Sequence, residues 1–203
     1  MTENIKQTYP RTYSDIEKST KKSGFTMASD VLTCSLLRTL ASSKPSGKFL
    51  ELGTGTGLGT SWILDGMDSS SSLLSLDFDK DVLSIAEQYL GDDKRLTLIC
   101  ADGGEWIEKN KHLKFDYIFA DTWHGKYFLL EEVISMLNDG GFYIIDDMLP
   151  QPNWPEGHAE KSTQLISDIE SRKDIIITKQ NWATGLIIAV KNNNRGLVNK
   201  ALN

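Results

Sequence analysis

The sequence predicts an α/β fold in which a doubly wound, mostly parallel sheet carries helices on both faces. Between residues 48 and 146, short apolar segments alternate with segments whose apolar residues recur at helical spacing. Each apolar segment has the length of a strand buried on both faces, as the strands of a parallel sheet are. The 203 residues suffice for one ordinary domain and are too few for two full-sized ones. We therefore expect one α/β domain.

The elements follow one another in a regular order. A helix is predicted over 27–41, ending before Pro45. Strands are predicted at 48–52, 73–77, 96–100, 116–120 and 141–146, joined by helices at 59–66, 79–90, 104–110 and 127–138. A further helix at 158–172 leads to strands at 174–178 and 185–190. The segment between these two strands is too short for a crossover helix, so we predict an antiparallel C-terminal pair.

The two ends of the chain are polar. Residues 1–22 hold five basic and three acidic side chains and few large apolar ones, which favours an N-terminal arm or lid over residues 1–26. The main domain is predicted over 27–191. Residues 192–203 have little to bury and are predicted to form a flexible tail.

Composition excludes several classes of partner. The net charge of −6 gives no basic excess to hold a phosphate backbone, so we expect no nucleic-acid partner. No stretch approaches about 18 consecutive apolar residues, so we expect no membrane partner. Residues 1–10 lack the apolar run of a secretory signal, and Cys34 and Cys100 lack metal-ligand spacing. These features predict a cytoplasmic protein.

A glycine-rich turn follows the first predicted strand of the sheet, with the sequence Glu51-Leu52-Gly53-Thr54-Gly55-Thr56-Gly57. Glycine permits the positive φ angles and close backbone approach that a nucleotide-like ligand requires there, although a tight turn without a ligand is the alternative. Leu58 stands where the dinucleotide fingerprint has glycine, which argues against a nicotinamide-dependent oxidoreductase. The Glu51 carboxylate would repel a pyrophosphate and attract an ammonium or sulfonium. S-adenosylmethionine carries both of these cations and no phosphate.

An acidic residue followed by Gly-x-Gly-x-Gly resembles the signature of the Rossmann-like methyltransferases that use S-adenosylmethionine. The resemblance implies that the cofactor is bound by the turn and by residues that follow the next strands: Glu51, Gly53, Thr54, Gly55, Gly57, Asp77, Phe78, Asp102, Gly103 and Asp121. In that family the carboxylate at Asp77 accepts hydrogen bonds from the ribose hydroxyls, and Asp102 is placed to accept from the adenine amine. The alternative is that Asp77 and Asp102 only cap the helices that follow them.

Three carboxylates follow the fourth and fifth predicted strands of the sheet. Asp121 ends one strand, and Asp146 and Asp147 end the other, so all three should meet at the edge where ligands bind. Oxygen ligands in this number suit magnesium or calcium, whereas the alternative is that they only finish strands or face solvent. The arrangement resembles the catechol-type, divalent-cation-dependent O-methyltransferases, which hold magnesium with two aspartates and an asparagine. Asp147 stands in place of that asparagine.

The segment Asp121-Thr122-Trp123-His124-Gly125-Lys126-Tyr127 extends this resemblance. Catechol-type enzymes have Asp-x-Trp-Lys-x-Arg-Tyr there and use the lysine as the catalytic base. His124 occupies the position of that lysine, and histidine titrates near neutrality. Lys126 is the competing candidate base. The alternative is that His124 and Lys126 are ordinary polar loop residues.

The expected function is methyl transfer from S-adenosylmethionine to a hydroxyl oxygen of a small molecule, assisted by magnesium. The resemblance suggests an aromatic acceptor with adjacent hydroxyls and a homodimer. Trp154, in a proline-rich loop, is a candidate wall for a flat substrate. Two alternatives stay open: a metal-independent methyltransferase with another acceptor, and a non-catalytic protein that binds S-adenosylmethionine.

Overall fold

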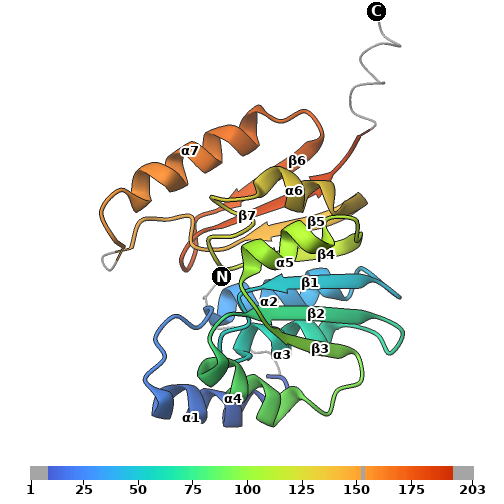
Figure 1. Cartoon of the computed structure of the whole chain (residues 1–203), viewed down its shortest axis with the longest axis vertical. Coiled ribbons are helices and arrows are strands. Elements are labelled where there is room, and N and C mark those ends of the chain that lie inside the picture. Colours follow the sequence, from blue (N-terminus) through green and yellow to red (C-terminus); the bar gives the residue numbers. More distant parts are fainter. Residues whose placement is uncertain (1–8, 152–153, 194–203) are drawn as a thin grey trace, which may run out of the picture.

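A computed structural model describes residues 9–151 and 154–193 as a sheet with helices on both sides (Figure 1). The strands are β1 (Lys48–Leu52), β2 (Ser72–Asp77), β3 (Leu96–Cys100), β4 (Phe115–Ala120), β5 (Leu137–Ile145), β6 (Ile175–Gln180) and β7 (Leu186–Lys191). They form one sheet in the order β3-β2-β1-β4-β5-β7-β6. The pairs from β3 to β5 are parallel, and β7 runs antiparallel to both β5 and β6. The predicted fold class and antiparallel C-terminal pair are confirmed.

The helices are α1 (Tyr13–Ser23), α2 (Val31–Ala41), α3 (Leu58–Gly66), α4 (Lys80–Leu90), α5 (Gly103–Asn110), α6 (Leu130–Ser135) and α7 (His158–Ser171). Two hydrophobic clusters separate them by face of the sheet. Phe49 and Tyr117 pack in the cluster that includes residues of α1 to α4, whereas Leu50 and Ile118 pack with residues of α5 to α7. Adjacent residues of one strand thus enter opposite clusters, as the strand period of two requires. The sheet is covered on both faces, as a doubly wound sheet is.

The predicted helix over 127–138 is too long, and this is a correction. Helix α6 covers only Leu130–Ser135, and Leu137 already begins β5, where it pairs with Phe115. The ladder between β4 and β5 then shifts register before Tyr117 pairs with Phe142. Apolar residues at helical spacing continued across the junction because both α6 and the start of β5 supply residues to the same buried cluster. Periodicity therefore could not locate the boundary.

Helix α1 lies within the segment predicted as an arm or lid. Its Ile16 is fully buried in the cluster formed with α2, α3 and α4. Helix α2 begins at Val31, four residues later than predicted, because the Asp30 side chain caps it by accepting from the amide of Leu32 at 2.7 Å. The rest of the predicted tail, from residue 194 on, lies outside the described residues.

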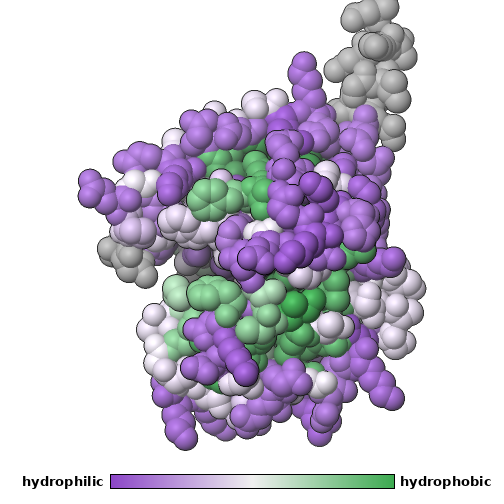
Figure 2. All heavy atoms as spheres, viewed as in Figure 1, coloured by the Kyte–Doolittle hydropathy of each residue, from purple (hydrophilic) through white to green (hydrophobic). Residues whose placement is uncertain are grey.

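The surface is mostly hydrophilic on the face shown in Figure 2, with hydrophobic side chains gathered over β1 to β3. Among the described residues, no helix has the length and apolar character needed to cross a membrane.

Candidate active site

The glycine-rich turn between β1 and α3 adopts a backbone that requires glycine. Gly53, Gly55 and Gly57 have φ angles of 101°, 53° and 89°. A Cβ on Gly53 would lie 2.7 Å from the carbonyl oxygen of Asp121, and one on Gly57 would lie 2.9 Å from the Cβ of Ala86. Both contacts are shorter than van der Waals packing permits, so side chains are excluded on steric grounds as well as conformational ones. The turn brings the β1–α3 backbone directly against the end of β4.

Asp77, at the end of β2, holds this turn from the other side. Its Oδ2 accepts a hydrogen bond from the amide of Gly55 at 2.8 Å, and its Oδ1 accepts from the amide of Asp79 at 3.0 Å. The cap of α4 is Asp79, whose side chain accepts from the amides of Asp81 and Val82. Asp77 therefore does not cap α4, which was the alternative interpretation of this residue. The next residue, Phe78, is 77% exposed and presents its ring to solvent.

Glu51 lies beneath the turn with a side chain that is 1% exposed. Its Oε2 accepts from the hydroxyl of Thr60 at 2.6 Å and from that of Ser75 at 2.5 Å. The Ser75 hydroxyl lies 2.6 Å from that of Thr54, so a chain of hydrogen bonds links the turn to the Glu51 carboxylate. Burial raises the pKa of Glu51 to about 7, and the two hydroxyl donors only partly offset this. The carboxyl group is therefore held within the protein, directly under the turn.

Asp102, at the end of β3, does cap the following helix. Its side chain accepts from the amide of Glu105 at 2.9 Å, and this hydrogen bond is the main reason that its pKa is lowered. A Cβ on Gly103 or Gly104 would lie 3.3 or 3.0 Å from atoms of the His124 side chain. His124 therefore packs against the start of α5, beside Asp102. It lies on the side of the site where the resemblance expects the adenine.

The three carboxylates after β4 and β5 are brought into one cluster, which we call the acidic cluster (Asp121, Asp146 and Asp147). Asp121 Oδ2 accepts from the hydroxyl of Ser29 at 3.1 Å. Asp146 is 1% exposed, and its Oδ1 accepts from the hydroxyl of Thr184 at 2.5 Å and from the amide of Asp147 at 2.8 Å. Burial raises the pKa of Asp121 and of Asp146, and repulsion within the cluster raises both further. The cluster therefore favours a bound proton or a compensating positive charge.

Lys126 supplies positive charge from within the chain. It is 3% exposed, and its Nζ donates to the carbonyl oxygen of Asp146 at 3.0 Å. It acts to lower the pKa of Asp121 and of Asp146, against the effect of burial. Of the two candidate bases, Lys126 thus lies at the acidic cluster, whereas His124 lies against α5.

The acidic cluster fits a divalent cation in its chemistry but not in its arrangement. Carboxylate oxygens are the ligands that magnesium and calcium prefer. Within residues 9–151 and 154–193, however, no three His, Cys, Asp or Glu side chains are grouped so as to hold a metal ion. Asp146 Oδ1 already accepts from the Thr184 hydroxyl and from the Asp147 amide. As arranged, these residues do not form a metal site.

An aromatic cluster beside the acidic cluster includes a histidine that no sequence motif singles out. His158, at the start of α7, is 8% exposed, and its Nε2 lies 3.0 Å from the hydroxyl of Tyr127. The ring of Trp154 stacks on it with centroids 4.1 Å apart, and the ring of Trp123 lies 5.4 Å away. His158 Nδ1 is buried without a hydrogen-bond partner among the described residues. These residues come from separate loops and a helix, so only the tertiary structure reveals the cluster.

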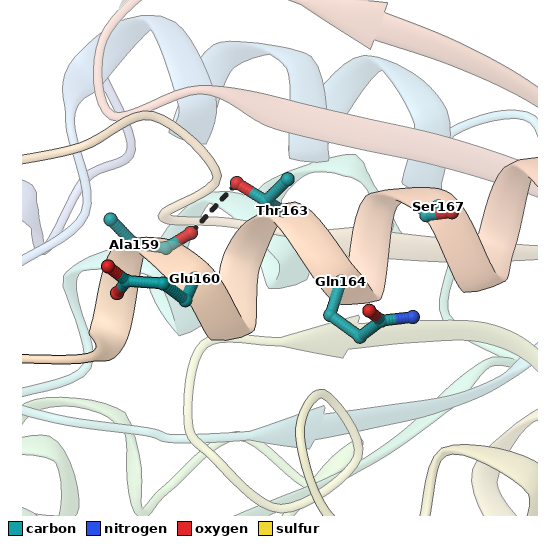
Figure 3. A pocket seen from close by; sticks show the side chains of 5 residues that line it. All are labelled: Ala159, Glu160, Thr163, Gln164 and Ser167. Atoms are coloured by element: carbon teal, nitrogen blue, oxygen red, sulfur yellow. Dashed lines mark hydrogen bonds between the residues drawn. The ribbon is translucent and has the colours of Figure 1, made fainter.

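A shallow groove lies along the outer surface of α7 (Figure 3). The side chains that line it are Ala159, Glu160, Thr163, Gln164 and Ser167, all from this helix. The Thr163 hydroxyl donates to the carbonyl of Ala159 at 2.9 Å, which is a bond within the helix.

Comparison with known proteins agrees with this architecture. A family described as a methyltransferase domain matches residues 50–148, which contain the glycine-rich turn, Asp77 and the acidic cluster. Several solved structures share the fold over nearly the whole chain. An O-methyltransferase from Bacillus cereus, in complex with S-adenosylhomocysteine, is 17% identical with a TM-score of 0.79, covering 93% of this chain and 94% of that chain.

Two further structures show the same likeness. The O-methyltransferase TomG from Streptomyces achromogenes, involved in tomaymycin synthesis and in complex with S-adenosylmethionine, is 15% identical with a TM-score of 0.79, covering 93% of each chain. A putative caffeoyl-CoA O-methyltransferase from Staphylococcus aureus is 16% identical with a TM-score of 0.75, covering 89% of this chain and 92% of that chain. Residues 50–148 thus match a methyltransferase domain, and nearly the whole chain shares the fold of these solved O-methyltransferases.

Proposed function

We propose that this protein transfers the methyl group of S-adenosylmethionine to a hydroxyl oxygen of a small molecule. The observation that carries the proposal is the hydrogen bond from the Gly55 amide to the Asp77 carboxylate, at 2.8 Å. It joins the glycine-rich turn to an acidic strand end, at the same edge of the sheet as the acidic cluster. Cofactor and acceptor would therefore meet at the carboxyl ends of β1, β2, β4 and β5.

The cofactor's parts find matching chemistry along this edge. The positive sulfonium and ammonium are favoured by the negative charge of Asp121 and of Glu51 beneath the turn. Gly53, Thr54, Gly55 and Gly57 would supply the close backbone surface. Asp77 would accept from the ribose hydroxyls, and the exposed ring of Phe78 would contact the adenine. Asp102 and Gly103 complete the proposed adenine site.

The reaction is a displacement at the methyl carbon. A lone pair of the acceptor oxygen forms the new O–C bond, while the C–S bond breaks and its electron pair stays on sulfur, which leaves neutral S-adenosylhomocysteine. The hydroxyl proton passes to a carboxylate of the acidic cluster, next to the Lys126 ammonium. Holding the oxygen and the methyl carbon in line lowers the barrier, because orientation replaces a chance encounter. His124, packed against α5, stays the competing base.

One observation favours an oxygen acceptor, and a second favours an acceptor that is flat. The structures with the same fold are described as O-methyltransferases, although at low identity. The aromatic residues Trp123, Tyr127 and Trp154 gather around His158 beside the acidic cluster, and such walls suit a flat acceptor. An aromatic compound with adjacent hydroxyls is the acceptor class we propose. A homodimer and a cytoplasmic location stay predictions, whereas the acidic cluster as arranged does not support magnesium assistance.

Cofactor recognition is tested by titration calorimetry with S-adenosylhomocysteine. Asp77→Ala is expected to weaken binding at least ~10-fold, because a hydrogen bond to a charged group contributes about 1.5–3 kcal/mol. Asp81→Ala is the matched control, since Asp81 is an exposed carboxylate on the first turn of α4. Equal affinity in wild type and Asp77→Ala would contradict the assigned site.

The reaction is tested by following S-adenosylhomocysteine release with catechols and with monophenols. Asp146→Asn is expected to lower kcat sharply while leaving cofactor affinity nearly unchanged. An equal loss of both would contradict this division between cofactor and acceptor residues. Tight cofactor binding without methyl transfer to any hydroxyl compound would contradict the proposed acceptor.

A further inference from the structure

Lys126 is a buried lysine whose Nζ lies against the backbone of the acidic cluster, whose carboxylates the resemblance assigns to a metal. Its side chain is 3% exposed, and Nζ donates to the carbonyl of Asp146 at 3.0 Å, the one hydrogen bond that it makes with the described residues. An ammonium has three N–H donors, so two stay available for a bound oxygen. Burying an ammonium is unfavourable unless negative charge compensates it, and here the acidic cluster does so.

The turn that carries Lys126 is fixed by its packing. Gly125 has a φ of 87°, and a Cβ there would lie 2.8 Å from the Cδ1 of Leu52. The Tyr143 hydroxyl donates to the carbonyl of Gly125, and the Lys126 amide donates to the carbonyl of Trp123 at 3.2 Å. The lysine therefore enters the acidic cluster from an anchored backbone, and its charge has a defined position.

The carboxylates of the cluster are oriented by donors from the protein itself. Ser29 donates to Asp121, and both Thr184 and the Asp147 amide donate to Asp146. Lys126 opposes the increase in the pKa of Asp121 and Asp146 that burial and mutual repulsion cause. Geometry and electrostatics thus both give the lysine the stabilising role that a bound cation would have.

We propose that the Lys126 ammonium takes the place of a divalent cation in the acceptor site, so that the protein needs no metal ion. Its charge holds the acidic cluster together and, resting on the proposed function, stabilises the acceptor oxygen as its negative charge develops. A divalent cation added to the wild-type cluster would be repelled by the buried ammonium. Removing the ammonium should leave the negative charge of the acidic cluster uncompensated, which favours binding of such a cation.

The test is titration calorimetry of Mg²⁺ and of Mn²⁺ into the full chain, with and without S-adenosylhomocysteine. Wild type is expected to show no saturable binding. Lys126→Met, which keeps the length of the side chain and removes its charge, is expected to bind Mn²⁺ at least ~10-fold more strongly than wild type. The double variant K126M/D147N should lose that gain. Lys173→Met, at an exposed lysine between α7 and β6, is the control and should behave as wild type.

Two outcomes would overturn the proposal. Saturable Mg²⁺ binding to wild type that Asp146→Asn abolishes would establish a metal site in the presence of the lysine. Absence of binding to a folded Lys126→Met protein would mean that the lysine does not occupy a cation position. If Lys126→Met does not fold, Lys126→Gln replaces it, and the wild-type titration still decides the first outcome.

Failure of this inference can be told apart from failure of the proposed function. Binding of S-adenosylhomocysteine is measured in the same samples, and the metal titration is also run without it. If the protein binds both S-adenosylhomocysteine and Mg²⁺, the lysine proposal fails and the proposed cofactor site stands. A protein that binds neither the cofactor nor Mg²⁺ contradicts the cofactor site, while the Mn²⁺ titration of Lys126→Met still tests the lysine.

Discussion

Asp77 and Asp79 stand two positions apart and have different roles. Asp77 accepts from the Gly55 amide across the sheet edge, whereas Asp79 accepts from two amides of its own helix, α4. Both are acidic residues after a strand, which is the sequence pattern of a helix cap and of a ligand site alike. The position of the glycine-rich turn distinguishes them, because it comes within hydrogen-bond distance of Asp77 alone.

At the residue scale, Gly125→Ala is expected to destabilise the protein for two separable reasons. An alanine at a φ of 87° is strained, and its Cβ would lie 2.8 Å from the Leu52 side chain. Gly140→Ala is the matched control, since Gly140 has a φ of 76° but no atom within 4 Å of the added Cβ. We expect Gly140→Ala to lower the free energy of unfolding by about 1–2 kcal/mol, and Gly125→Ala by about 1–3 kcal/mol more.

Denaturant unfolding of wild type and both variants measures these differences. Equal destabilisation by the two substitutions would mean that the close contact with Leu52 relaxes freely, and that the turn carrying Lys126 is not tightly packed.

At the scale of the elements, helix α1 connects the N-terminal segment to the cofactor turn. The hydroxyl of Thr20 lies 2.7 Å from that of Thr56, and both side chains are buried. Ile16, one turn earlier, is fully buried against the body of the domain. The predicted arm or lid thus contains a helix that packs on the domain and touches the turn that would hold S-adenosylmethionine.

Thr20→Val is expected to weaken S-adenosylhomocysteine binding by ~2–10-fold, because it removes one hydrogen bond that orders the turn. Valine keeps the shape of threonine, so packing changes little. Thr39→Val is the control, since the Thr39 hydroxyl donates to Ser35 within α2. Titration calorimetry measures the affinity of both variants for S-adenosylhomocysteine, and thermal unfolding measures their melting temperatures. A lower melting temperature of Thr20→Val with unchanged affinity would restrict α1 to a structural role.

At the scale of the whole molecule, buried carboxyl groups couple stability to pH. The folded protein raises the pKa of Glu51 from 4.5 to about 7, chiefly by burial. The folded state therefore holds this proton more tightly than the unfolded state does. By linkage, the free energy of unfolding falls as pH rises from about 4.5 to about 7, and the penalty is fully present above that range.

Glu51→Gln should remove this dependence while keeping an oxygen that accepts from Thr60 and Ser75. The difference in unfolding free energy between the variant and wild type is expected to shift in favour of the variant by about 3 kcal/mol from pH 4.5 to pH 8. Asp81→Asn, at an exposed carboxylate, should show no such shift. Urea titrations at several pH values measure it, and a constant difference would mean that Glu51 is ionised throughout.

Much of the fold was predictable because its signals are local. The strands β1 to β4 fall within one residue of their predicted bounds, since each is a short apolar run bounded by polar or glycine residues. The junction of α6 and β5 was not, because the residues on both sides of it face one buried cluster and continue the same spacing. Hydrophobic pattern identifies what is buried but does not determine which element buries it.

The composition of the site was largely readable, whereas its internal contacts were not. Glycines at alternate positions after a strand, and aspartates at the ends of four other strands, can be recognised along the chain because parallel strands end at a common edge. Which of His124 and Lys126 reaches the acidic cluster depends on the turn held by Leu52 and Tyr143. Thr184 orients Asp146 from 38 positions away, and His158 meets Tyr127 from 31 positions away. These pairings arise from packing between distant segments, and only the tertiary structure decides them.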